Sequence, residues 1–113
     1  MRNRLSTHLM AGVLSLLCNF AIAENCVVPQ EFWDRPRSGE RVVALASIKP
    51  CVMPILNEQG QLVLHHRNND EATLHAEELQ GWLAALALDP ARMSLRGDLQ
   101  NEDELIIERV GTQ

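Results

Sequence analysis

The chain contains few basic residues, and this shortage argues against several classes of partner. Lysine and arginine together number 10 among 113 residues, against 15 aspartates and glutamates, which gives a net charge of −5. An acidic chain lacks the general electrostatic attraction to phosphate groups that lets basic proteins bind nucleic acids and anionic membrane surfaces. We therefore expect no nucleic-acid partner.

Most catalytic and cofactor-binding motifs are absent too. The sequence has no Cys-x-x-Cys, no Gly-x-Ser-x-Gly and no glycine-rich phosphate loop. Neighbouring carboxylates such as Glu77 and Glu78 do not face each other on a helix, because consecutive helical residues diverge by about 100°. We therefore predict a protein that is not an enzyme and that carries no cofactor.

Long hydrophobic runs are confined to the first part of the chain. Arg2 and Arg4 precede an uncharged apolar run at 9–20, which is followed by a small-x-small cleavage pattern ending at Ala23. The run is shorter than the roughly twenty residues of a membrane span. We predict a signal peptide at 1–23, cleavage after Ala23, a periplasmic protein and no membrane span. The remaining 90 residues hold eight basic and all fifteen acidic residues, a net charge of −7.

Cysteine is scarce, but its count is informative. Cys18 lies in the predicted signal peptide, which leaves Cys26 and Cys51 in the exported chain. Two cysteines in a short exported chain are typical of a structural disulfide. The bridge would close a loop of about 25 residues and contribute roughly 3 kcal/mol in the chain-entropy treatment.

The exported chain divides into two parts. Residues 24–40 are rich in turn-forming residues and lack periodicity, so we predict an ordered N-terminal arm that packs on an α+β domain at 41–113. Two interpretations of Phe32 and Trp33 stay open. The rings lie near arginines and would suit a recognition patch, or they fill a small core.

The first half of the domain gives mixed signals. Residues 41–48 form an apolar run that fits a buried strand or a short helix, and its valines favour a strand. Residues 51–56 and 61–66, on either side of a polar turn that ends in glycine, predict a β-hairpin. Leu62 and Leu64 would face the core.

The second half gives clearer signals. Leu79, Trp82, Leu83 and Leu86 recur at helical spacing and predict an amphipathic helix over 73–88. Short strands follow at 93–96 and 104–110. The predicted fold is therefore α+β, a small sheet of three to five strands with one amphipathic helix packed on one face.

Three histidines within eleven residues raise the question of a metal site. His65 and His66 are adjacent in a predicted strand and point to opposite faces, so they do not reach one ion together. One of them paired with His75 would still lack a clear third ligand. We therefore predict no metal.

Residues 68–97 resemble the central part of the outer-membrane protein A-like C-terminal domain, a module by which many envelope proteins bind peptidoglycan. That family's helix reads Asn-x2-Leu-Ser-x2-Arg-Ala-x2-Val-x3-Leu, and its helix exit and next strand read Leu-x-x-x-Gly-Ile-Asp-Pro-Ala-Arg-Ile-x-x-x-Gly. The matching positions here are Asn68, Ala76, Leu79, Leu83 and the segment 85–97, and 104–110 resembles the last strand.

The departures from this pattern concern ligand binding. His75 stands where the family has the arginine that binds the diaminopimelate carboxylate of the peptide stem, and Glu71 and Ala72 replace leucine and serine. The loop 67–70 offers no clear counterpart of the family's ligand-binding aspartate, and 97–104 is too short for its second helix. A histidine lacks the two-pronged geometry of a guanidinium. The resemblance therefore implies the fold more strongly than the binding.

These observations favour an exported, periplasmic, non-enzymatic accessory or interaction protein of a cell-envelope assembly of the secretion, conjugation or pilus type, with an envelope protein as partner. Its expected contact residues are Phe32, Trp33, Asn68 and His75. One alternative is a weak peptidoglycan-binding module with Asn68 and His75 at the ligand site. Another is a periplasmic inhibitor or immunity protein.

Overall fold

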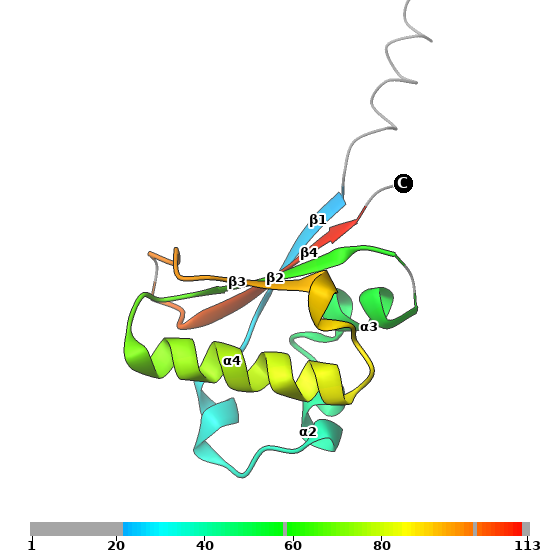
Figure 1. The fold of residues 1–113 in the computed structure, drawn as a ribbon. Coiled ribbons are helices and arrows are strands. Elements are labelled where there is room, and N and C mark those ends of the chain that lie inside the picture. Colours follow the sequence, from blue (N-terminus) through cyan, green and yellow to red (C-terminus); the bar gives the residue numbers. More distant parts are fainter. Residues whose placement is uncertain (1–21, 58, 101, 112–113) are drawn as a thin grey trace, which may run out of the picture.

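The computed structural model describes residues 22–57, 59–100 and 102–111 (Figure 1). Residues 1–21 of the predicted signal peptide lie outside the described residues. The fold class is α+β, as predicted, with a four-stranded mixed sheet. The elements in chain order are β1 (Ile22–Val27), η1 (Gln30–Asp34), α2 (Gly39–Ala44), α3 (Lys49–Asn57), β2 (Gln61–His66), α4 (Asp70–Ala85), η2 (Pro90–Arg92), β3 (Met93–Arg96) and β4 (Leu105–Gly111).

The strands lie in the order β1-β4-β2-β3. β4 pairs antiparallel with β1 on one side and with β2 on the other, and β2 pairs parallel with β3. A parallel pair needs a crossover connection, and α4 supplies it between β2 and β3. The two ends of the described chain, β1 and β4, are therefore neighbours in the sheet.

One face of the sheet carries the core. Alternate residues of each strand point to this face, so Leu62 and Leu64 of β2 are buried there, as predicted. Helices α3 and α4 pack against it, and α2 and η1 lie on the far side of α4 (Figure 1). Large side chains that are fully buried in this core include Phe32, Ile48, Ile55, Leu79, Leu83, Leu88, Leu105 and Ile107.

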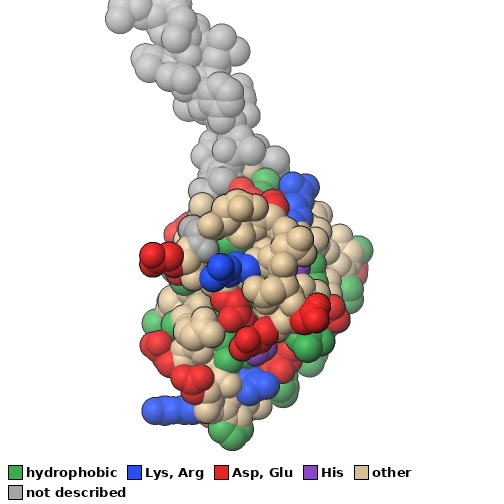
Figure 2. Space-filling view, turned by 90° about the vertical axis from the view of Figure 1, so that its left-hand side faces the viewer, with side chains coloured by type: hydrophobic (Ala, Val, Ile, Leu, Met, Phe, Trp, Pro, Cys, Tyr) green, Lys and Arg blue, Asp and Glu red, His purple; other side chains and the backbone are tan. Residues whose placement is uncertain are grey.

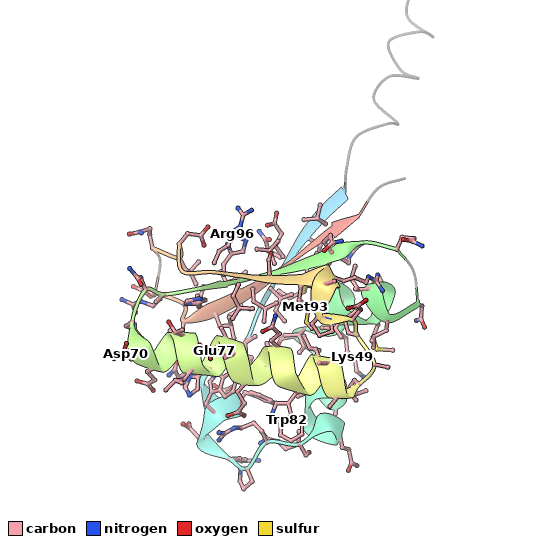
Figure 3. All side chains as sticks on the ribbon, viewed as in Figure 1. Lys49, Asp70, Glu77, Trp82, Met93 and Arg96 are labelled. Carbon is pink, nitrogen blue, oxygen red and sulfur yellow. A yellow bond between two sulfur atoms is a disulfide. The ribbon has the colours of Figure 1, made fainter. Side chains whose placement is uncertain are left out.

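The other face of the sheet has no helix over it among the described residues (Figure 1). Val27, Val63 and Ile106 point to this face and are partly or largely exposed. Arg96 of β3 also projects from the side of the sheet away from α4 (Figure 3). One face of the sheet is therefore buried against helices, and the other, the open face, carries no helix among the described residues.

Helix α4 begins three residues earlier than predicted. Asn69 is its N-cap, because the side-chain oxygen accepts a hydrogen bond from the amide of Ala72 at 2.8 Å. Ala72 and Ala76 are buried and extend the apolar stripe of Leu79 and Leu83 toward the helix start. Alanines add little to a hydrophobic pattern, so the start of this stripe is not evident in the sequence.

Helix α4 ends in a Schellman motif built on an alanine. The amide of Leu88 donates to the carbonyl of Leu83 at 3.1 Å, and the amide of Ala87 donates to the carbonyl of Ala84 at 3.0 Å. This geometry requires a positive φ, which is 77° at Ala87. Glycine favours that conformation, and the family pattern quoted above has glycine at this position.

Ala87→Gly is therefore expected to stabilise the fold. The substitution relieves the steric clash of a Cβ at positive φ, and part of the gain is offset by the larger entropy of glycine in the unfolded chain. We expect the free energy of unfolding to rise by about 0.5–1 kcal/mol, measured by urea denaturation. Ala84→Gly, inside the same helix, is the matched control and should destabilise the protein by about 1 kcal/mol. A loss of stability in Ala87→Gly would contradict this account of the cap.

Two elements of the first half differ from the prediction. The run 41–48 is not a strand, because α2 covers Gly39–Ala44 and Ser38 caps it by accepting from the Arg41 amide at 3.1 Å. The segment 51–56 is not half of a hairpin either, because it lies in α3. Pro50 is tolerated in the first turn of that helix, where its missing N–H has no intrahelical partner to lose.

The segment 24–40, predicted as an arm, contributes all of strand β1 except Ile22 and Ala23, the turn η1 and the start of α2. Cys26 of β1 and Cys51 of α3 form the predicted disulfide, with Cα atoms 6.2 Å apart, which confirms the pairing. The bridge joins the edge strand to a helix under the sheet. No helix among the described residues is long and apolar enough to span a membrane.

Candidate functional site

Phe32 and Trp33 lie in η1 and point into the protein. Phe32 is 1% exposed and Trp33 is 8% exposed. Their ring centroids are 5.0 Å apart with an angle of 82° between the ring planes, an edge-to-face arrangement. Of the two interpretations left open by the sequence, the structure places both rings in the core rather than on a broad surface patch.

His75 of α4 packs against Trp33 of η1. The two rings stack with centroids 4.1 Å apart and an angle of 2° between their planes. The Nδ1 atom of His75 contacts a carboxylate oxygen of Glu104, which precedes β4. The structure therefore brings together two of the predicted contact residues, Trp33 and His75, and adds a carboxylate that the sequence analysis did not assign.

Glu104 is held from a second side and faces a second carboxylate. Its other oxygen accepts a hydrogen bond from Gln30 Nε2 at 3.1 Å. Glu71 lies one helical turn before His75 on α4, and the ligand atoms of Glu71, His75 and Glu104 all lie within 4.8 Å of one another. Figure 2 looks onto the end of the molecule where α4 begins and shows acidic side chains gathered around a histidine on this face. Among the described residues, these three form a group that could hold a metal ion.

An ion pair borders this cluster. Arg37 Nε and Nη2 donate to the two oxygens of Glu78 at 2.7 and 2.9 Å, and Trp82 Nε1 donates to Glu78 at 3.1 Å. The hydrogen bonds from Arg37, followed by that from Trp82, lower the pKa of Glu78 to about 2 despite the opposing effect of burial. The pair fastens the segment after η1 to α4, and Figure 3 shows Trp82 on the side of α4 that faces this segment.

Asn68 is separate from this cluster in its interactions. The residue is exposed between β2 and α4, and no hydrogen bond among the described residues joins its side chain to His75. Asn69, rather than Asn68, caps the helix. The structure therefore does not assemble the two residues into one polar site.

A small pocket lies between η1 and α2. It has a volume of about 220 Å³ and is lined by Pro29, Glu31, Phe32, Arg35, Arg41 and Leu45. The guanidinium carbon of Arg41 lies 5.0 Å from the centroid of the Phe32 ring. Arg41 also donates to the carbonyl of Pro36, and neither Arg35 nor Arg41 has a carboxylate partner among the described residues. The pocket therefore combines an apolar floor with two unpaired positive charges.

The open face of the sheet carries a second histidine between two acids. His65 Nδ1 lies 2.7 Å from Asp98 Oδ1, and His65 Nε2 lies 2.9 Å from Glu108 Oε1. Both ring nitrogens can donate at once only in the imidazolium form. Burial lowers the pKa of His65, but the hydrogen bonds to Glu108 and Asp98 outweigh that effect and raise it above the usual value. The same contact with His65 lowers the pKa of Asp98.

This arrangement predicts a pH dependence of stability. Because the pKa of His65 is raised in the folded state, its contribution is complete below the unfolded value of about 6.5 and is lost as the pH rises through the folded value. We expect the wild type to lose about 1 kcal/mol more than His65→Gln between about pH 6 and pH 9, measured by urea denaturation. Equal pH slopes in the two proteins, or an imidazole that titrates below about 6.5 by NMR, would contradict the prediction.

Comparison of the chain with known protein families, characterised proteins and solved structures finds no match.

Proposed function

We propose that this protein is an exported, non-enzymatic accessory module that binds a segment of a partner protein in a cell-envelope assembly. The pocket between η1 and α2 is the observation that carries the proposal. It is a basic feature on a chain whose residues 24–113 have a net charge of −7. Arginine is one of the residue types enriched among interface hot spots, and Arg35 and Arg41 have no carboxylate partner within the part of the chain that the structure describes.

The chemistry of the pocket defines its occupant. Phe32, Leu45 and Pro29 supply an apolar floor, whereas Arg35 and Arg41 supply charge at the rim. Glu31 also lines the pocket, so two positive charges stand against one negative charge there. The matching ligand is a peptide segment in which a carboxylate follows or precedes an apolar side chain. Arginine suits this role because its planar guanidinium accommodates both oxygens of a carboxylate.

The size of the pocket supports a peptide rather than a cofactor. Sites for cofactors and other small molecules usually have volumes of about 300–1,000 Å³. The volume of about 220 Å³ here suits a single side chain of an extended segment. Such a contact is weak on its own, so we expect the neighbouring surface of the partner to contribute as well.

The disulfide supports the exported location. Disulfides form and persist in oxidising compartments such as the bacterial periplasm. The bridge between Cys26 and Cys51 joins two elements that are 25 residues apart in the chain. Together with the predicted signal peptide at 1–23, it favours function outside the cytoplasm.

Site-specific photo-crosslinking tests this function. A benzoyl-phenylalanine at Leu45, which lines the pocket, is introduced into the full chain in living cells, and one at Ser94, on the open face of the sheet, is the control. We expect crosslinking at position 45 to a protein segment with an acidic residue beside an apolar one. Arg35→Glu should abolish this crosslink, and Arg96→Glu, at an exposed arginine of β3, should leave it unchanged. Crosslinks that appear equally at positions 45 and 94, or that persist in Arg35→Glu, would refute the proposal.

Peptidoglycan binding is a second candidate. It is favoured because α4, β3 and β4 lie at the positions that resemble the helix and strands of the outer-membrane protein A-like pattern. The ring of His75 is occupied by Trp33 and Glu104, so the candidate depends on Asn68, which is exposed. Sedimentation with purified sacculi tests it. Binding that is lost in Asn68→Ala would support the candidate, and no sedimentation of the wild type would dismiss it.

A further inference from the structure

We propose that Glu71, His75 and Glu104 form a binding site for a divalent transition-metal cation such as Zn²⁺. This site is distinct from the pocket assigned to the partner segment. Its three residues provide one imidazole nitrogen and two carboxylate oxygens, which are the donor types that zinc binds in proteins. Two of them stand at i and i+4 on α4, and the third arrives from the segment before β4.

The separations fit a single ion. Zinc binds imidazole nitrogen and carboxylate oxygen at about 2.0–2.2 Å, so two atoms on one ion are at most about 4.4 Å apart. The three ligand atoms here lie within 4.8 Å of one another. Binding of the ion therefore requires the direct contact between His75 Nδ1 and Glu104 to open and the most distant pair of ligand atoms to approach slightly.

Neighbouring groups hold two of the three ligands in place. Trp33 stacks on the ring of His75, with centroids 4.1 Å apart, and fixes the plane of the imidazole. Gln30 Nε2 donates to the Glu104 oxygen that does not face His75, at 3.1 Å. Support of this kind orients ligands and raises the affinity of metal sites. Glu71 is exposed and leaves one side of the site open to water, as in zinc sites that have three protein ligands.

The second histidine cluster shows why this arrangement is specific. His65 also contacts two carboxylates, but Asp98 lies at its Nδ1 atom and Glu108 at its Nε2 atom. The two acids therefore stand on opposite edges of the ring and do not converge on one ion. Around His75, in contrast, both carboxylates come within reach of the same point. The protein thus contains an internal control that also combines one imidazole with two carboxylates.

Zinc titration of the protein purified from cells that express the full chain tests the site. We expect saturable binding of one Zn²⁺ by isothermal titration calorimetry. Bound Co²⁺ should give the visible spectrum of a low-coordinate site, with three protein ligands and water. Loss of a group that only supports a metal ligand typically weakens binding by about 10–100-fold, so Glu71→Gln and His75→Gln, which each remove a ligand, should weaken Zn²⁺ binding by at least about 10-fold. His65→Gln should bind as the wild type does.

Glu71→Gln is the decisive variant because Glu71 forms no hydrogen bond or ion pair with another described residue. Its substitution leaves the fold in place, whereas His75→Gln also removes the stacking on Trp33. The wild type should gain thermal stability on addition of Zn²⁺, and Glu71→Gln should gain less. The proposal is overturned if the wild type does not bind Zn²⁺, if Glu71→Gln binds it equally well, or if His65→Gln loses binding to the same extent.

Discussion

Phe32→Ala is expected to lower the free energy of unfolding by about 3–5 kcal/mol, the usual effect of removing a buried phenylalanine from a core. Phe32 is 1% exposed, and its ring packs edge-to-face with Trp33 and lies under the guanidinium of Arg41. A domain of this size has a total stability of about 5–15 kcal/mol. The substitution should therefore bring the protein close to unfolding at room temperature. Urea denaturation followed by circular dichroism measures the effect.

The effect of Phe32→Ala also distinguishes a role of the Phe32 ring in the core from a role in contact with a partner. Leu74→Ala is the control, because Leu74 is a large apolar side chain on α4 that is 64% exposed. This control should change stability by less than about 0.5 kcal/mol. If Phe32→Ala were no more destabilising than Leu74→Ala and yet abolished the crosslink from position 45, Phe32 would be a contact residue rather than part of the core.

The parts of the fold that the sequence predicts are those with local signals. β2, β3 and β4 are short apolar runs bounded by polar or turn residues, and α4 has a stripe at helical spacing. Helices α2 and α3 also have local signals, which lie at their first turns. Ser38 is a standard N-cap for α2, and Pro50 lies in the first turn of α3, a position that suits proline. Continuous apolar content alone does not separate a strand from a helix.

Strand β1 depends on distant residues and has no comparable local signal. Its partner is β4, and the ion pair between Glu24 and Arg109, at 3.2 Å, joins residues 85 positions apart. Hydrophobic periodicity over a window of a dozen residues carries no information about such a pairing.

The candidate metal site could not be predicted for a similar reason. Glu71 and His75 share a helix face, which their spacing indicates, but the third ligand is 29 residues beyond His75. The stacking of Trp33 on His75 also joins elements that are distant in the chain. The spacing of the three histidines therefore gives no indication of Glu104 as a third ligand. The register that places Glu104 beside α4 is a property of the assembled sheet.

Removal of the disulfide in Cys26→Ala/Cys51→Ala is expected to lower the free energy of unfolding by about 3 kcal/mol. The bridge closes a loop with a sequence separation of 25, and its main effect is to reduce the conformational entropy of the unfolded chain. For a domain of about 90 residues, this change lowers the melting temperature by about 15 °C. Thermal unfolding followed by circular dichroism, with the wild type and the double variant at the same protein concentration, measures it.

The contribution of the disulfide to stability can be measured by substituting the cysteines or by reducing the wild type. Comparison of the two results tests whether the covalent bond itself is responsible. Both sulfur atoms are buried, so the double variant loses some packing as well as the covalent bond. Reduced wild type loses only the bond and should therefore lie between the oxidised wild type and the double variant. A reductant should not change the double variant at all. If reduction left the melting temperature of the wild type unchanged, the bond between β1 and α3 would contribute nothing, and the packing of the core alone would hold the edge strand in the sheet.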